Sequence, residues 1–199
     1  MTMFIILFIL VFGIPLLKEE IENEQYRQMC YRRGDKTYWS TTGYILDFGC
    51  GSGRDTKCFL REGYQVDAVD GSKELCKMAS EYTGLEVKNM FFQELSEVNK
   101  YDGIWACSSI LHVTPSELED VMTKMITALK DGGVIYTSFK YGTFSGERNG
   151  RYFTDMTEET FADLLNRTGD LEIEEQWITS DVRPGRGEEK WLNLILRKR

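Results

Sequence analysis

The chain has 199 residues, of which 42% are hydrophobic and 28% are charged, and its formal net charge is −8. This length and composition favour one globular domain of ordinary size, with a single core, over a disordered chain. The acidic balance disfavours a protein that wraps duplex nucleic acid, because such proteins carry a positive surplus.

The first 42 residues differ from the rest of the chain. Residues 4–17 are almost wholly apolar, interrupted only by Gly13 and Pro15. This run is shorter than the roughly 18–20 residues of a membrane-spanning helix, and it lacks the positive flank and cleavage site of a secretory signal. Three interpretations stay open: a buried helix or strand, a weak membrane anchor, or a beginning that is not native to the domain. We expect an atypical segment over residues 1–42, with a helix at Glu19–Tyr31, before one domain over residues 43–199.

From Gly43 onward, predicted strands and helices alternate. Apolar residues at i, i+3, i+4 and i+7 behind Ser72 indicate a helix that packs on a sheet. The clearest helix start has Thr114 as N-cap, Pro115 at the first helical position and Glu117 completing a capping box. The predicted strands are Tyr44–Phe48, Tyr64–Val69, Leu85–Asn89, Gly103–Cys107, Val134–Phe139, Leu171–Thr179 and Trp191–Leu196. The predicted helices cover Arg54–Glu62, the segments after Ser72 and Thr114, and the stretch from Thr157 to Gly169.

This order predicts the fold class. Strands that alternate with helices form a parallel sheet wound by right-handed crossovers. The last two strands have no helix between them, so they must pair antiparallel, because a parallel return needs a longer crossover. We predict an α/β fold with a Rossmann-like, doubly wound, seven-stranded sheet that is mostly parallel and has its last strand antiparallel.

The strongest chemical signal is a glycine-rich turn between the first strand of the domain and the helix that follows. Gly49, Gly51 and Gly53 allow the backbone to turn sharply and to approach a ligand without a Cβ in the way. Asp70 closes the second strand, where a carboxylate can accept hydrogen bonds from both ribose hydroxyls of a nucleoside. The alternative is that Asp70 only begins the turn before Ser72. Together the glycines and the carboxylate predict a nucleoside site.

Two residues indicate which nucleoside is bound. A dinucleotide site with the pattern G-x-G-x-x-G would have its third glycine at the position of Arg54. The strand before the turn contains Asp47, whose carboxylate would repel a pyrophosphate and attract an ammonium group. S-adenosylmethionine carries an ammonium and a sulfonium and no phosphate. The residues therefore favour this methyl donor over a nicotinamide dinucleotide.

Four stretches resemble the ordered motifs of class I S-adenosylmethionine-dependent methyltransferases, most closely the small bacterial, tellurite-resistance-like type: ILDFGCGSGRD, AVDGS, YDGIWACSSILHV and LKDGGVIYTSFK. In that family the equivalents of Asp47 and Gly49–Gly53 hold the methionine end of the donor, and the equivalent of Asp70 holds the ribose. The backbone at Ala106–Ser108 would line the methyl-transfer site. The resemblance thus implies S-adenosylmethionine as cofactor, bound by Asp47, Gly49, Cys50, Gly51, Gly53, Asp70, Gly71, Phe91, Phe92, Ala106 and Cys107.

The sequence departs from the family pattern in two places. The family has an acidic residue after the third strand that binds the adenine amine, and here that position is Phe91. A phenylalanine can pack on adenine but cannot accept its hydrogen bond. The aromatic-rich helix with which these enzymes commonly begin is not evident in residues 1–42.

Candidate acceptor residues follow the fourth, fifth and sixth strands. His112, the only histidine, could act as a general base, or it could only pack within its loop. Two later segments are rich in arginine and aromatic residues, and arginine forks suit carboxylates or phosphates. The alternative is that these arginines are solvated and paired with Glu147, Glu188 and Glu189. The substrate-binding candidates are Tyr141, Arg148, Arg151, Tyr152, Arg183 and Arg186.

These patterns lead to one functional hypothesis, methyl transfer from S-adenosylmethionine to a small, anionic acceptor. The alternatives are methylation of nucleic acid or protein, a donor-binding but inactive module and, last, a nicotinamide enzyme. A nucleic-acid amino-methyltransferase would carry Asn-Pro-Pro or Asp-Pro-Pro plus an aromatic residue where this chain has Cys107-Ser108-Ser109-Ile110. Five cysteines without metal-ligand or disulfide spacing predict reduced thiols in a cytoplasmic protein and no metal site. We expect a monomer or dimer that contacts no nucleic acid, and no membrane unless through residues 4–17.

Overall fold

The computed structural model describes residues 32–33, 36–37, 43–181, 183 and 185–199. The chain divides into two units, Met1–Ser40 and Thr41–Arg199. Within the first unit, strands β1 (Arg32–Arg33) and β2 (Lys36–Thr37) pair antiparallel.

The predictions for the N-terminal apolar run, residues 4–17, and for a helix over Glu19–Tyr31 lie outside the described residues. Within the described part of the chain, no helix has both the length and the apolar character needed to cross a membrane.

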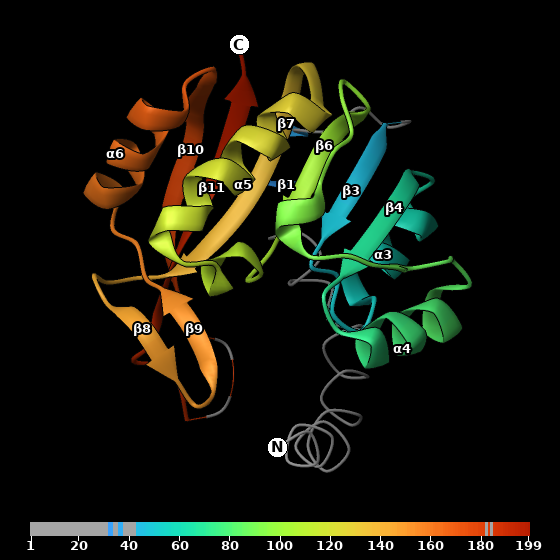
Figure 1. The fold of residues 1–199 in the computed structure, drawn as a ribbon, viewed down its shortest axis with the longest axis horizontal. Coiled ribbons are helices and arrows are strands. Elements are labelled where there is room, and N and C mark those ends of the chain that lie inside the picture. Colours follow the sequence, from blue (N-terminus) through green and yellow to red (C-terminus); the bar gives the residue numbers. More distant parts are fainter. Residues whose placement is uncertain (1–31, 34–35, 38–42, 182, 184) are drawn as a thin grey trace. The chain divides into compact units, whose positions relative to one another are not determined.

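The second unit is built on one seven-stranded sheet in the order β10-β11-β7-β6-β3-β4-β5 (Figure 1). Its strands are β3 (Tyr44–Phe48), β4 (Gln65–Asp70), β5 (Lys88–Asn89), β6 (Tyr101–Ala106), β7 (Leu129–Lys140), β10 (Leu171–Ser180) and β11 (Lys190–Lys198). The neighbouring pairs from β7 to β5 are parallel, whereas β11 is antiparallel to both β7 and β10. The predicted fold class is therefore confirmed. The winding direction reverses between β3 and β6, so the carboxyl ends of these two strands form the switch point at which α/β sheets bind ligands.

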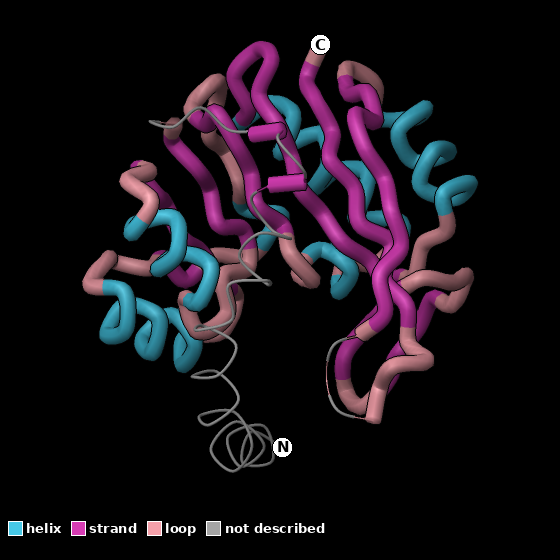
Figure 2. The backbone as a smooth tube through the Cα atoms, turned by 180° about the vertical axis from the view of Figure 1, so that it is seen from behind, coloured by secondary structure: helices cyan, strands magenta, loops and turns pink. Residues whose placement is uncertain are grey.

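Helices cover both faces of the sheet (Figure 1, Figure 2). The helices α3 (Arg54–Arg61) and α4 (Lys73–Thr83) lie on one face, and α5 (Pro115–Ala128) and α6 (Glu158–Thr168) lie on the other. Strand alternation decides which side chain meets which layer. Leu46 and Phe48 are fully buried in the core that includes α5 and α6, whereas Asp47, between them, bonds to α3. The same alternation thus builds the core and places a carboxylate at the opposite face.

Two predicted boundaries are wrong. Strand β5 has only two residues, because the backbone N–H groups of Leu85 and Val87 bond instead to Thr83 and Ser80 of α4. Strand β7 begins at Leu129, directly after α5, five residues before the predicted start at Val134. A register shift in the pairing of β6 with β7 accommodates the extra length.

The predicted capping box at Thr114 is also wrong. The Thr114 hydroxyl donates to the Glu117 carboxylate at 2.6 Å, and no backbone N–H donates to it. A hydrogen bond to an ionised carboxylate is stronger than a neutral one, which explains this choice of partner. At α6, in contrast, the Thr157 hydroxyl does accept from the backbone N–H of Thr160, so the predicted start there is confirmed.

Between β7 and α6 lies a hairpin that is not among the predicted strands. Its strands are β8 (Ser145–Arg148) and β9 (Arg151–Thr154), paired antiparallel. Asn149 and Gly150 form the two-residue turn, with φ values of 52° and 76°. Both values lie in the left-handed region that hairpin turns of this length require and that asparagine and glycine tolerate.

Candidate functional site

The turn between β3 and α3 contains three glycines, Gly49, Gly51 and Gly53, and each has a φ in the left-handed region that favours glycine. Gly49 has φ +88°, and a Cβ built there would lie 2.5 Å from the Cβ of Ser109 and 3.2 Å from the ring of Phe92. Gly51 has φ +57°, and a Cβ there would have no heavy atom within 4 Å. The first glycine therefore permits close packing against the loop after β6, whereas the second faces open space, as expected where a ligand approaches the backbone.

Asp47 is a buried carboxylate in β3, with 2% of its surface exposed. It accepts a 2.5 Å hydrogen bond from the hydroxyl of Thr56 on α3. Burial, and then the nearby carboxylate of Asp55, raise the pKa of Asp47 to about 7, although Thr56 and Arg54 oppose the shift. Among the described residues, no cationic group lies within ion-pair distance of Asp47. Such a carboxylate is stabilised in its charged form by a cation that enters the site.

Asp70, at the end of β4, is held by the backbone. One carboxylate oxygen accepts from the N–H of Gly51 at 2.9 Å, and the other accepts from the N–H of Ser72 at 2.9 Å. The side chain thus supports the turn before Ser72, as the alternative interpretation expected, and it also contacts the glycine loop. Each carboxylate oxygen has a further lone pair that a ligand hydroxyl can use.

Phe91 follows β5 and is 63% exposed, which is unusual for an aromatic side chain. A Cβ on Gly71 would lie 3.2 Å from its ring, so the ring rests on the backbone directly after Asp70. Phe92, in the short η1 turn (Phe92–Glu94), instead points inward and packs edge-on against Phe48, with ring centroids 4.8 Å apart. The two neighbouring phenylalanines therefore differ: one presents an open face, and the other supports Gly49.

The backbone after β6 makes an unusual turn at the predicted methyl-transfer site. Ser108 has φ +52°, a left-handed value, and its N–H donates to the hydroxyl of Ser138 at 2.9 Å. Cys107 is half-buried, and burial, followed by the charge of Asp55, raises the pKa of its thiol to about 11. At that pKa the thiol stays protonated at neutral pH, so Cys107 is not activated as a nucleophile.

His112 ends the short η2 turn (Ile110–His112), which follows β6. Its Nδ1 atom lies 2.8 Å from the carbonyl oxygen of Tyr152, and its ring packs edge-on against Phe153 at 4.7 Å. A carbonyl oxygen only accepts, so Nδ1 carries the proton and Nε2 keeps a lone pair. Burial lowers the pKa of His112, the bond to Tyr152 opposes this, and the charge of Arg151 lowers it further. The imidazole is therefore neutral at pH 7 and able to accept a proton.

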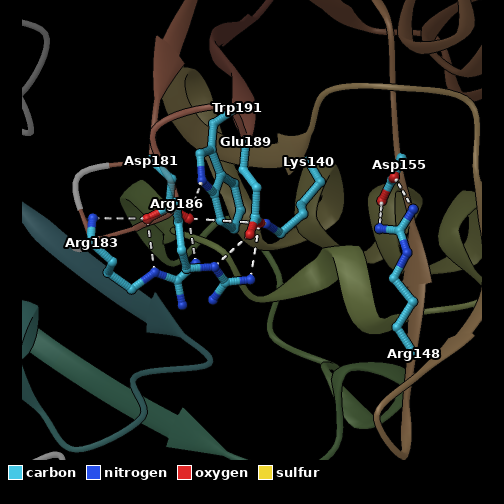
Figure 3. Close-up of polar contacts among 8 residues, drawn as sticks. All are labelled: Lys140, Arg148, Asp155, Asp181, Arg183, Arg186, Glu189 and Trp191. Carbon is cyan, nitrogen blue, oxygen red and sulfur yellow. Dashed lines mark hydrogen bonds and ion pairs between the residues drawn. The ribbon is translucent and has the colours of Figure 1, made fainter.

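Three of the four predicted substrate-binding arginines have carboxylate partners, as the alternative interpretation expected, but two of these three partners are not the expected glutamates. Arg148 forms two bonds of 3.0 and 2.7 Å with Asp155 (Figure 3). Arg183 pairs with Asp181. Arg186 pairs with Glu189, as Figure 3 shows. Sequence proximity did not identify Asp155 as a partner because the hairpin β8–β9 folds back before it.

The remaining candidates lie around the hairpin. Arg151 is exposed in β9, close enough to His112 to influence its pKa. The hydroxyl of Tyr152 lies 2.8 Å from that of Ser145, and the hydroxyl of Tyr141 donates to Glu158 at 3.0 Å. The structure thus associates His112 with Arg151 and Tyr152, whereas Arg183 and Arg186 form a separate group.

Comparisons with known proteins agree with this geometry. A family model described as a methyltransferase domain matches residues 45–133. The chain is 26% identical, over 148 residues, to an uncharacterized methyltransferase of Staphylococcus carnosus (strain TM300), which covers 69% of this chain and 72% of that protein. It is 39% identical, over 100 residues, to N-terminal Xaa-Pro-Lys N-methyltransferase 1 of Xenopus tropicalis, covering 46% of this chain and 45% of that protein. The chain therefore spans less than half the length of that second relative.

The fold is similar to a solved structure as well. With a TM-score of 0.67 and 24% identity, it matches 1,6-didemethyltoxoflavin-N1-methyltransferase of Burkholderia thailandensis over 79% of this chain and 71% of that chain. That crystal structure holds 1,6-didemethyltoxoflavin and S-adenosylhomocysteine. The residues matched by the family model include the glycine turn, Asp70, Phe91 and His112. They exclude the hairpin and the arginines after it.

Proposed function

We propose that this chain is a class I S-adenosylmethionine-dependent methyltransferase that transfers the methyl group of its donor to a small acceptor carrying a negative charge. The observation that carries the donor half of this proposal is the buried carboxylate of Asp47, beside a glycine turn that leaves open space at Gly51. S-adenosylmethionine supplies an activated methyl group on a sulfonium centre.

The described residues fit this donor. Asp47 would pair with the ammonium of its methionine part, which would give the buried carboxylate the cation that it lacks among the described residues. Asp70 would accept hydrogen bonds from the ribose hydroxyls with its remaining lone pairs. The exposed ring of Phe91 offers an apolar face for adenine next to Asp70, and it replaces the hydrogen bond of an acidic residue by stacking.

On the acceptor side, His112 would remove the proton from the attacking hydroxyl or amine. The bond from Nδ1 to the Tyr152 carbonyl fixes the tautomer, so that Nε2 is the basic atom. Since the donor is already activated, orientation of the acceptor by the loops after β6 and β7 would supply much of the remaining rate enhancement. Nothing in this scheme requires a cysteine nucleophile.

A second candidate acceptor is the α-amine of a protein N-terminus. It is favoured by the 39% identity, over 100 residues, to N-terminal Xaa-Pro-Lys N-methyltransferase 1 of Xenopus tropicalis. A neutral histidine base suits an amine acceptor as well as a hydroxyl.

The test is a methyl-transfer assay with labelled donor against a cell extract, run untreated and after protease or nuclease treatment. The proposal predicts label in low-molecular-mass products that survives both treatments. Loss of label only after protease treatment would favour the protein N-terminus, and loss only after nuclease treatment would favour nucleic acid. No label in any fraction, with donor bound, would identify an inactive binding module.

A further inference from the structure

Five charged side chains form an alternating chain at one edge of the sheet, in the order Arg183, Asp181, Lys140, Glu189 and Arg186 (Figure 3). Lys140 lies at its centre, 3.9 Å from the Asp181 carboxylate and in direct ion-pair contact with Glu189. Each carboxylate is thus shared between the central lysine and one terminal arginine. We call this set the Lys140 chain.

The Lys140 chain carries one net positive charge, since three cations meet two carboxylates. Its centre is buried, with 11% of the Lys140 side chain and 2% of the Asp181 side chain exposed. Its two terminal side chains are partly exposed, 44% for Arg183 and 41% for Arg186. The Arg186 guanidinium therefore presents positive charge to solvent in a protein whose net charge is −8.

Glu189 leaves part of the Arg186 guanidinium group available. Glu189 binds the Nε and one terminal nitrogen of Arg186, at 2.5 and 3.0 Å. The other terminal nitrogen has no partner among the described residues. A guanidinium has five N–H donors, and Glu189 occupies only two of its nitrogens. The edge formed by the two terminal nitrogens can therefore still donate to an oxyanion. Trp191 adds rigidity, because its ring lies under the Lys140 ammonium at 4.8 Å and its N–H donates to Asp181.

The Lys140 chain lies on the acceptor side of the sheet. Lys140 ends β7, and Asp181 and Glu189 flank the loop between β10 and β11, all at the edge where the parallel strands end. Ala106, the last residue of β6, pairs with Thr137 of β7, three residues before Lys140. At about 3.3 Å per residue along a strand, the backbone of Lys140 lies on the order of 10 Å beyond the end of β6, measured along the strands.

We infer that the Lys140 chain is an oxyanion-recognition site of the acceptor, which selects a small molecule bearing a carboxylate or phosphate. This inference rests on the proposed function. It assigns the recognition to Arg186, with Lys140 as a positioning residue, and it does not include Arg148. The Arg148 guanidinium is bound end-on by buried Asp155 and packs over the Phe144 ring at 3.8 Å, so it stabilises the hairpin.

The experiment measures the affinity of inorganic phosphate and of acetate by calorimetry, at constant ionic strength set with chloride, with S-adenosylhomocysteine at saturation. Because S-adenosylhomocysteine already occupies the donor site, any heat of anion binding comes from another site. If S-adenosylhomocysteine itself does not bind, the proposed function fails, and this outcome is separate from failure of the anion site. In the wild-type protein we expect binding of one or both oxyanions beyond that of chloride, and the two titrations distinguish a preference for phosphate from one for carboxylate.

Two variants have opposite expected effects. Arg186→Gln should weaken oxyanion binding about tenfold or more, the loss expected for a charge-assisted bond, with donor affinity unchanged. Glu189→Gln removes a negative charge from the chain and should strengthen oxyanion binding, an effect that loss of structure would not produce. The matched control is Arg167→Gln, which breaks an exposed ion pair with Glu119 between α6 and α5. Equal affinity in wild type and Arg186→Gln, weaker binding in Glu189→Gln, or no preference over chloride would overturn the inference.

Discussion

His112 and Tyr152 are 40 positions apart in the chain, yet the Nδ1 atom of His112 lies 2.8 Å from the main-chain carbonyl oxygen of Tyr152. The contact joins the loop after β6 to the hairpin β8–β9. It fixes the tautomer of the only histidine in the protein, and it does so through the backbone, so the identity of the side chain at position 152 does not matter for it.

Replacing His112 by glutamine should lower the rate of methyl transfer about 10²-fold or more, the range for loss of a general base, and leave donor affinity intact. Tyr152→Phe is the matched control, because it removes only the hydroxyl beside Ser145 and keeps the carbonyl. The pKa of His112 lies below its ordinary value of 6.5, so the wild-type rate should decline only as pH falls below that value and the ring gains a proton. An unchanged rate in the glutamine variant would show that His112 only packs.

Donor binding should depend on pH through Asp47. Its pKa is raised to about 7, so the carboxylate gains a proton as pH falls through that value and can no longer pair with an ammonium. Donor affinity should be highest above pH 7 and decline below it by up to about tenfold per pH unit. Asp47→Asn should bind donor weakly and without this pH dependence. A wild-type affinity that stays constant between pH 8 and pH 5 would contradict the assigned role.

Gly49 and Gly51 should respond differently to replacement by alanine. Gly49→Ala should destabilise the fold by about 2–4 kcal/mol, because its Cβ would collide with Ser109 in a left-handed backbone. Gly51→Ala should cost only about 1–2 kcal/mol, for the backbone alone, and should weaken donor binding through the methyl placed in the open space. Urea denaturation and donor titration of both variants separate the two effects. Equal stability losses would mean that the packing at Gly49 is not as described.

Asp67 in β4 is a structural carboxylate far from this chemistry. It accepts hydrogen bonds from Lys100, Tyr44 and Tyr101 at 2.6–2.8 Å. Burial alone would raise its pKa, but these three donors, led by Lys100, hold the pKa below its ordinary value of 3.8. Asp67→Asn should destabilise the protein at pH 7 by about 1–3 kcal/mol.

The sign of the pH dependence follows from the lowered pKa. The stability that Asp67 provides is fully present above pH 3.8 and is lost as pH falls through the lower folded-state value. The difference in unfolding free energy between wild type and Asp67→Asn should therefore be constant above about pH 5 and shrink as pH falls below about 4. A difference that does not shrink below about pH 4 would mean that the carboxylate is not stabilised by its partners. Glu97→Gln is the control, since Glu97 approaches Lys100 only to 3.9 Å.

The sequence predicted the sheet well because its signals are local. Periodicity, the glycine turn and the N-cap at Thr157 act within a few residues, and the helix-free return of β10 to β11 leaves only one pairing direction. The hairpin could have been found as well, since Asn149-Gly150 is a strong turn signal. Its flanking strands, however, are only four residues each and lack an apolar alternation.

The partners of individual side chains could not be predicted from the sequence. The pairing of Arg148 with Asp155 depends on how the hairpin turns back, and the approach of Lys140 to Glu189 depends on the register of β7 with β11. Ser109 is similar: its hydroxyl is buried without a hydrogen-bond partner against Gly49, because the left-handed turn at Ser108 directs it there. Such contacts come from tertiary packing, which propensity and motif spacing do not encode.

The proposed function depends most directly on what the glycine turn and Asp47 bind. The decisive measurement is a pair of calorimetric titrations of the wild-type protein at pH 8, one with S-adenosylmethionine and one with a nicotinamide dinucleotide. We predict saturable binding of the methyl donor with one site per chain, no binding of the dinucleotide, and affinity for the donor reduced about tenfold or more in Asp47→Asn. Binding of the dinucleotide in preference to the donor, or wild-type donor affinity in Asp47→Asn, would contradict it.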